Sequence, residues 1–442
     1  MLTREEAKKL SEKILSYSTF PECVVHVDAE EDAFVRFANN GLTTSGLVRQ
    51  QQISVSSTKD RKTGNTGVNQ IDDKSLRDAV ARSEEMAAIA LPNQEYVPAL
   101  GPQQYMPLDR VDPATASARS PELIVHARNV IDGARSKQLV AAGFVQRAAR
   151  ASAVASKTGL FGYYASADSS LTATVRTSAG DGSGWASQPA LHFGQMDSNA
   201  VARKAIDKCL ASRGAKRIEP GKYTVVMEPA AVASLVEYMG FGISARAAEE
   251  GRSFLSKDGG GTRLGEKVFP EWITVRSDPS IASIPARPWG GDLVPAQPIA
   301  WVDAGVVKNL HYDRFWAMKK DRPPSPPAAS IILDGQDHSL EDLIAATDRG
   351  LLITHFWYIR FVNPKTVQLT GLTRDGLLLI EKGKIVGPVM NLRFNESPVR
   401  LLQNAKMLGR PMRVSEDEVG DDVVMPPIQT TEFTFSSVSD AV

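Results

Sequence analysis

Residues 370–394 read TGLTRDGLLLIEKGKIVGPVMNLRF, which is the most specific pattern in the chain. The apolar residues 377–380 and 385–386 flank Lys382-Gly383, a pair typical of a tight turn between two strands. Residues 393–395 lie beyond and read as a further strand. The stretch therefore predicts a hairpin with another strand after it.

The same character extends back to residue 219, where the composition changes at Glu219-Pro220-Gly221. Residues 223–227 read as a buried strand, and a helix with one apolar face is predicted to begin near Pro229. The last 25 residues are polar, although residues 433–435 could add an edge strand. We predict one β-rich C-terminal domain over residues 219–442.

The first half of the chain is predicted to hold two similar α/β units, at residues 1–90 and 119–218. Each has a helix, extended segments, a glycine-rich turn and a second helix. Residues 91–118 between them form a proline-rich linker. In the first unit, Asp72 or Asp73 could cap a helix that runs to about Ala90, with Leu76, Ala79, Val80 and Ser83 as its buried stripe.

Matched spacing supports a true duplication. Gly41 and Ile53 are twelve residues apart, as are Gly159 and Leu171, and Gly64 maps onto Gly182 at the same offset. Chance similarity between two amphipathic α/β segments is the alternative. Together the segments predict an α+β fold, with duplicated N-terminal α/β units followed by a β-rich C-terminal domain.

The charge balance argues against some classes of partner. Lys and Arg number 51, and so do Asp and Glu, so no basic field points to nucleic acid or to an anionic membrane surface. No apolar run approaches the roughly 18–20 residues that cross a bilayer. The N-terminus has no apolar signal-peptide core, so a cytoplasmic location is expected. The two cysteines, Cys23 and Cys209, are expected to be buried thiols.

Residue chemistry alone does not name a reaction. No two of the six histidines have the spacing that places metal ligands on one helical face. His355 lies in an apolar strand-like segment. A histidine in such a segment is more often a hydrogen-bonded core residue than a residue that lines a functional cavity. The glycine run at residues 258–262 lacks the lysine of a phosphate-binding loop, and no GxSxG motif occurs.

The hairpin sequence resembles the closing signature of the TldD/PmbA family, in which a pattern of the form IEnGki…pv.nlRf is typical. Residues 302–308, residues 347–354 and the stretch from Asn39 to Leu42 also resemble that family. The resemblance implies two related N-terminal α/β regions and a β-rich C-terminal domain, in agreement with the duplication.

In TldD-type members a helix bears an HExxxH motif that binds zinc and supplies the catalytic glutamate. Here the corresponding positions hold Glu237, Tyr238 and Gly242. No histidine lies between His192 and His311, and no cysteine follows Cys209. Because catalytic zinc needs about three protein ligands, the resemblance implies that this chain binds no metal and has no catalytic residue at the family's motif.

The resemblance therefore points to the PmbA (TldE) type, a non-catalytic subunit that pairs with a TldD-type catalytic subunit carrying the zinc. Such a complex performs proteolysis on peptides or unfolded segments. Two alternatives stay open: a stand-alone homo-oligomeric peptidase or other hydrolase, and a peptide-binding module. For these, the candidate cavity residues are His355, Arg374, Asp375 and Arg393.

Overall fold

The N-terminal half forms one antiparallel sheet in the order β3-β2-β1-β4-β5-β6. The computed structural model describes residues 1–415 and 423–439. The six strands are β1 (Glu22–Ala38), β2 (Gly41–Lys59), β3 (Lys62–Val68), β4 (Leu139–Ser156), β5 (Phe161–Thr177) and β6 (Ser183–Ala190). Four helices accompany them: α1 (Arg4–Tyr17), α2 (Asp73–Ile89), α4 (Ser120–Ser136) and α5 (Ser198–Ala211).

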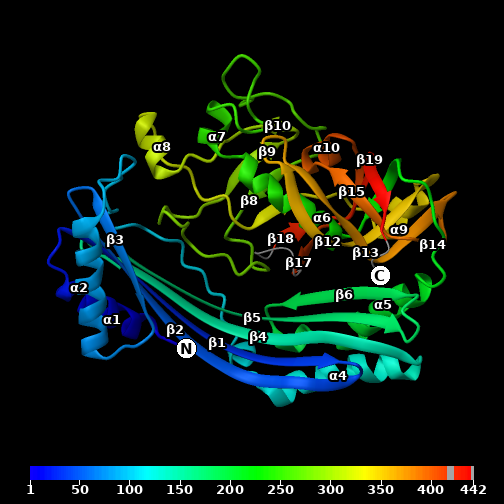
Figure 1. Cartoon of the computed structure of the whole chain (residues 1–442), viewed down its shortest axis with the longest axis horizontal. Helices are drawn as coiled ribbons and strands as arrows, with labels where there is room; N and C mark the ends of the chain where they lie inside the picture. The colour runs from blue at the N-terminus through cyan, green and yellow to red at the C-terminus, as the bar shows by residue number, and fades with distance from the viewer. Residues whose placement is uncertain (416–422, 440–442) are drawn as a thin grey trace.

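The four helices cover one face of this sheet. Val25 and Val27 of β1 pack in a core with α1 and α2, and Ala33 and Val35 of the same strand pack with α4 and α5. Alternate residues of a strand point to the same side, so both cores lie on the same face. Figure 1 shows α4 on the side away from the C-terminal strands.

The duplication is visible in the sheet. Helix, three strands and helix occur twice, and β1 pairs antiparallel with β4 around the opposed residues Glu31 and Ala149. A Cβ on Gly64 would strike the backbone of α2, and one on Gly184 would strike the backbone of α5. The structural equivalent of Gly64 is thus Gly184, two residues beyond the predicted Gly182. Each glycine lets a helix approach its edge strand closely.

Helix α2 and the turn between β1 and β2 follow from local sequence signals. Asp72 caps α2, and the four predicted stripe residues are buried. Asn39 and Asn40 both adopt positive φ in the tight turn between β1 and β2. Helix α4 begins at Ser120, with Arg119 at the N-cap position and Pro121 in its first turn. Helix α3 (Pro113–Ser117) lies within the predicted linker.

Five C-terminal strands form a closed ring of hydrogen-bonded neighbours, β7-β19-β15-β13-β12 and back to β7. They are β7 (Lys222–Met227), β12 (Arg349–Asn363), β13 (Gln368–Glu381), β15 (Leu392–Glu396) and β19 (Ile428–Val438). Strand β14 (Lys384–Val389) adds to β13, and β16 (Ala405–Leu408) adds to β19. The prediction of an edge strand at residues 433–435 is wrong, because β19 lies between two partners and buries Phe433 and Phe435 in the barrel.

A second C-terminal sheet has the order β10-β9-β8-β11-β18-β17. Its strands are β8 (Val275–Ser277), β9 (Ile299–Asp303), β10 (Val306–Val307), β11 (Ile331–Leu333), β17 (Met412–Val414) and β18 (Val423–Met425). Helix α6 (Pro229–Val236) has all eight residues buried in the core that this sheet and the barrel share. The remaining helices with labels in Figure 1 are α7 (Ala245–Glu249), α8 (Arg314–Lys319), α9 (Leu340–Ala345) and α10 (Pro398–Gln403).

The architecture is therefore the predicted α+β class, with a β-rich C-terminal region above the inner face of the duplicated sheet (Figure 1). The exact domain boundaries stay a prediction. Among the described residues, none of the helices has the length and apolar character needed to span a bilayer.

Candidate functional site

A bulge in β13 directs Asp375 out of the barrel wall. Ile353 of β12 pairs with Leu377 and His355 pairs with Arg374, so Thr354 alone faces Asp375 and Gly376. Both of these residues have positive φ, +55° and +115°. Thr354 holds the distortion by donating its hydroxyl to the carbonyl of Asp375 at 3.1 Å. Bulges commonly redirect a side chain in this way near functional sites.

The Asp375 carboxylate is 3% exposed and has three polar neighbours. Ser183 Oγ donates a short hydrogen bond to Oδ1, and His355 Nδ1 lies 3.2 Å from Oδ2. Arg374 Nε lies 3.9 Å from Oδ2. Burial alone would raise the pKa of Asp375, but the bond from His355, the bond from Ser183 and the charge of Arg374 hold this pKa below its usual value. Asp375 is therefore a buried, ionised carboxylate at neutral pH.

His355 is also clamped by Trp185. The two rings stack with centroids 4.4 Å apart and an interplanar angle of 2°. Trp185 belongs to β6, the edge strand of the N-terminal sheet, whereas His355 belongs to β12 of the barrel. The prediction of a buried, hydrogen-bonded histidine is confirmed, and its two partners come from opposite sides of the junction.

A buried ion cluster lies beside this contact. Glu228, the residue that caps α6, accepts from Lys208 Nζ at 2.9 Å and from Lys204 Nζ at 2.8 Å. Lys208 Nζ also donates to the carbonyl of Trp185 at 3.0 Å. Burial lowers the pKa of Lys208 to about 8 despite the opposing charge of Glu228, while the two lysines keep the pKa of Glu228 below its usual value. The cluster fixes α5 of the second unit to the start of α6.

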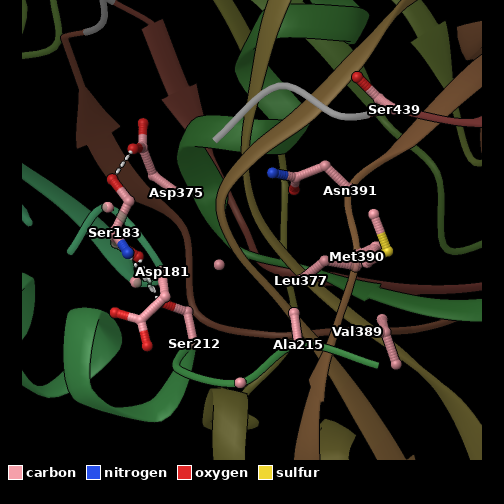
Figure 2. Close-up of a pocket in the computed structure, with 14 residues that line it drawn as sticks. Asp181, Ser183, Ser212, Ala215, Asp375, Leu377, Val389, Met390, Asn391 and Ser439 are labelled. Atoms are coloured by element: carbon pink, nitrogen blue, oxygen red, sulfur yellow. Dashed lines mark hydrogen bonds between the residues drawn. The ribbon is translucent and has the colours of Figure 1, made fainter. Parts of the chain in front are cut away.

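A pocket of about 300 Å³ opens at this junction (Figure 2). Asp375 and Ser183 meet at its wall, joined by the dashed hydrogen bond in Figure 2, and Asp181 and Ser212 lie beneath them. Leu377, Val389 and Met390 give the opposite side an apolar surface. The volume is at the lower end for small-ligand sites, and its polar groups can bind and orient a small polar group.

The structure brings together three of the four candidate residues. His355, Arg374 and Asp375 meet at the bulge, as described above. Arg393 is exposed on β15 and contacts none of them through a described polar interaction. Sequence reasoning missed Ser183, Trp185, Lys208 and Glu228. The glycine-rich run from Gly180 to Gly184 flanks Ser183 and was the only signal available for any of them.

Glu237, Tyr238 and Gly242, which the resemblance aligns with the zinc motif, lie in a short 3-10 helix, η2 (Glu237–Gly242), directly after α6. Tyr238 is half-buried among aromatic side chains, and a Cβ on Gly242 would lie 2.4 Å from the ring of Phe254. Within the described ranges, no group of three or more His, Cys, Asp or Glu side chains is arranged to hold a metal ion. A side chain at position 242 would therefore require Phe254 to move.

A larger cavity of about 940 Å³ lies between the inner face of the N-terminal sheet and the C-terminal loops. Its sheet side carries mainly polar residues of β4 and β5, among them Arg150, Tyr164 and Asp168. Its other side includes the loop residues Trp289 and Asp292, together with Gly240 of η2. The cavity thus reaches the region of the motif positions.

Comparisons with known proteins agree with the fold described above. Residues 220–437 match the profile described as the PmbA/TldA metallopeptidase C-terminal domain. No curated protein matches the sequence.

Solved structures match nearly the whole chain. TldE from Thermococcus kodakarensis has a TM-score of 0.86 at 17% identity, with 97% of this chain and 99% of that chain covered. A protein from Thermotoga maritima, described as a proposed modulator of DNA gyrase, has a TM-score of 0.84 at 16% identity. The match covers 97% of this chain and 100% of that chain. A protein with a similar description from Bacteroides thetaiotaomicron gives 0.84 at 20% identity, with 99% and 100% covered. At these identities the likeness establishes a shared fold.

Proposed function

This chain belongs to the PmbA/TldD metallopeptidase family, and from that premise we propose that it is the non-catalytic subunit of a zinc peptidase complex. Its partner is a TldD-type chain that carries the zinc and the catalytic glutamate. The complex acts on peptides or unfolded segments, and this chain contributes part of the wall of the substrate chamber.

The local structure at η2 is the observation that carries the proposal. A catalytic zinc site needs about three protein ligands and a general base. At the corresponding positions this chain has Glu237, an aromatic residue packed in a cluster, and a glycine against Phe254. These residues support the proposal that the chain keeps the family fold but leaves the zinc to its partner.

The large cavity supports the chamber role. Its volume of about 940 Å³ is at the upper end of the range for ligand sites, roughly 300–1,000 Å³. Serine and glutamine side chains on its sheet wall offer hydrogen bonds to a peptide without selecting one sequence. Such a wall suits a complex that accepts varied unfolded segments.

The buried cluster at the bulge does not favour the alternative of a stand-alone hydrolase. In a Ser-His-Asp catalytic triad the serine hydroxyl donates to one imidazole nitrogen, and the carboxylate accepts from the other. Here Ser183 donates to Asp375, and Asp375 lies between Ser183 and His355. The arrangement fits a role in holding the N-terminal sheet on the barrel.

Reconstitution tests the proposal. We would purify this chain, an HExxxH-bearing relative from the same organism, and their mixture, and would assay each for cleavage of an unstructured peptide. Activity that appears only in the mixture supports the proposal. A matched mixture, in which the glutamate of the relative's HExxxH motif is replaced by glutamine, should be inactive.

Cleavage by this chain alone would contradict the proposal and favour the stand-alone enzyme. A chain that binds the peptide but changes nothing in the relative's activity would favour the binding module.

A further inference from the structure

One face of the barrel wall carries partly exposed aromatic side chains together with arginines. Trp357 of β12, Leu372 of β13 and Arg393 of β15 lie directly opposite one another across three neighbouring strands. Cross-strand partners point to the same side of a sheet. Their row therefore lies on the outer face, whereas the adjacent Phe356 and Phe394 fill the barrel core.

A second bulge pushes an additional aromatic ring onto this face. Trp357 pairs with Leu372 and Arg360 pairs with Thr370, so two residues of β12 lie opposite one residue of β13. Ile359 points inward and is fully buried, and Tyr358 has a φ of +57° and is 51% exposed. Positive φ is uncommon for a bulky residue, and here it places Tyr358 beside Trp357 on the outside.

The rim of the barrel continues the same surface. Phe361 packs edge-on against Tyr238 and Phe241, with ring centroids 5.1 Å and 5.7 Å away. Phe241 is nevertheless 72% exposed, and Phe361 is 37% exposed. Large aromatic side chains gathered in this way on a surface mark a binding site more often than scattered single residues do.

The charge on this face is positive. The Arg374 guanidinium lies 4.2 Å from the Trp357 ring centroid, and that of Arg360 lies 4.3 Å from the Tyr358 ring centroid. Among the described residues, neither Arg360 nor Arg393 forms an ion pair with a carboxylate. A partner surface with apolar groups and carboxylates would complement this face in both polarity and charge.

We propose that this aromatic face, comprising Phe241, Trp357, Tyr358, Arg360, Phe361 and Arg393, docks the catalytic partner subunit through a surface of carboxylates around an apolar centre. The inference rests on the function proposed above. Tryptophan, tyrosine and arginine are the residues most enriched at the energetic centres of protein interfaces. The positive charges of Arg360 and Arg393, which form no ion pair within residues 1–415 and 423–439, supply the charge complementarity that orients such a partner.

The test measures the Kd between this chain and the HExxxH-bearing relative by titration calorimetry at two salt concentrations. Tyr358→Ala and Arg393→Glu are each expected to weaken binding by roughly tenfold or more, as substitutions at interface centres do. Raising the salt should weaken wild-type binding, because exposed charges are screened.

Two matched controls separate this face from general surface effects. Val386→Ala removes an exposed apolar side chain on β14, and Arg128→Glu reverses an exposed charge on α4, on the far side of the N-terminal sheet (Figure 1). Both should bind like the wild type. Unchanged thermal unfolding midpoints would establish that all four variants are folded.

The outcomes distinguish the two proposals. If the wild type binds and the face variants bind equally well, the docking face is wrong and the proposed function stands. If the wild type does not bind the relative, both proposals fail. If the face variants instead disrupt a self-association of this chain, or if a mixed-sequence oligonucleotide binds the face in competition, the occupant is not the catalytic partner and the inference is overturned.

Discussion

The imidazole of His355 lies parallel to the indole of Trp185, with centroids 4.4 Å apart. This stack joins the edge strand β6 of the duplicated sheet to β12 of the barrel. The Ser183–Asp375 hydrogen bond and the Lys208–Glu228 ion pair lie beside it and cross the same junction. These buried contacts together help to hold the C-terminal half on the N-terminal sheet.

Trp185→Ala should remove the stack and leave a cavity at the junction. Truncation of a buried tryptophan costs about 3–5 kcal/mol of unfolding free energy, and Trp185 is buried. Denaturant unfolding of the variant measures this cost. Trp272→Ala is the control, because Trp272 is 39% exposed and should lose far less. Equal losses for the two variants would contradict the role of the stack.

Glu228→Gln should destabilise the fold, because Lys208 would stay buried without its counter-charge. Removing one partner of a buried ion pair costs about 3 kcal/mol or more. The double variant Glu228→Gln with Lys208→Met should recover much of that loss, since it buries no charge. A double variant as unstable as the single one would mean that the loss does not come from an uncompensated charge on Lys208.

The inner face of the N-terminal sheet predicts a distinct pH dependence. Burial and the negative charge of Glu30 raise the pKa of Asp32 from 3.8 to about 6. Between those two values the folded chain keeps a proton that the unfolded chain has lost, so folding stability falls as the pH rises through this window. At pH values above about 6, the loss of folding free energy caused by the buried Asp32 charge no longer changes with pH.

Asp32→Asn should therefore be more stable than the wild type at pH 7.5 and about equal to it at pH 4. Urea unfolding at both pH values tests this expectation. A wild type that gains stability over the Asn variant as the pH rises would show that Asp32 is held as a favourable ion pair instead.

Gly242→Ala should lose about 1–3 kcal/mol of stability, the range for overpacking a well-packed site. The new Cβ would lie 2.4 Å from the Phe254 ring. Gly240→Ala in the same short helix is the matched control, since a Cβ there meets nothing within 4 Å. The control should be neutral or slightly stabilising, because alanine reduces the freedom of the unfolded chain. A tolerated Gly242→Ala would mean that Phe254 moves aside, and that a histidine could be accommodated there.

Much of the local structure could be predicted from the sequence. Helix α2 follows from its apolar periodicity and its capping aspartate, and the turns at Asn40 and Lys382 follow from their dipeptides. These signals depend on neighbours within a few residues. The order of strands in a sheet depends instead on residues far apart in the sequence. The local pattern at residues 433–435 therefore predicts an edge strand, although β19 is an interior strand of the barrel wall.

The candidate site was predicted only in part, for the same reason. His355 and Asp375 stand out because they are polar residues in apolar strands. Ser183 and Trp185 lie far away in the sequence and reach the site because the first residues of β6 pack against the barrel. The bulge that directs Asp375 depends on the register between β12 and β13, which a strand pattern alone does not reveal.

The zinc content of the purified chains tests the central claim most directly. Elemental analysis would be made on this chain alone, on the HExxxH-bearing relative alone, and on the complex after extensive dialysis. The account predicts no stoichiometric zinc in this chain and one zinc per heterodimer in the complex, held by the relative. Near-stoichiometric zinc in this chain alone, lost on substitution of residues near η2, would contradict it.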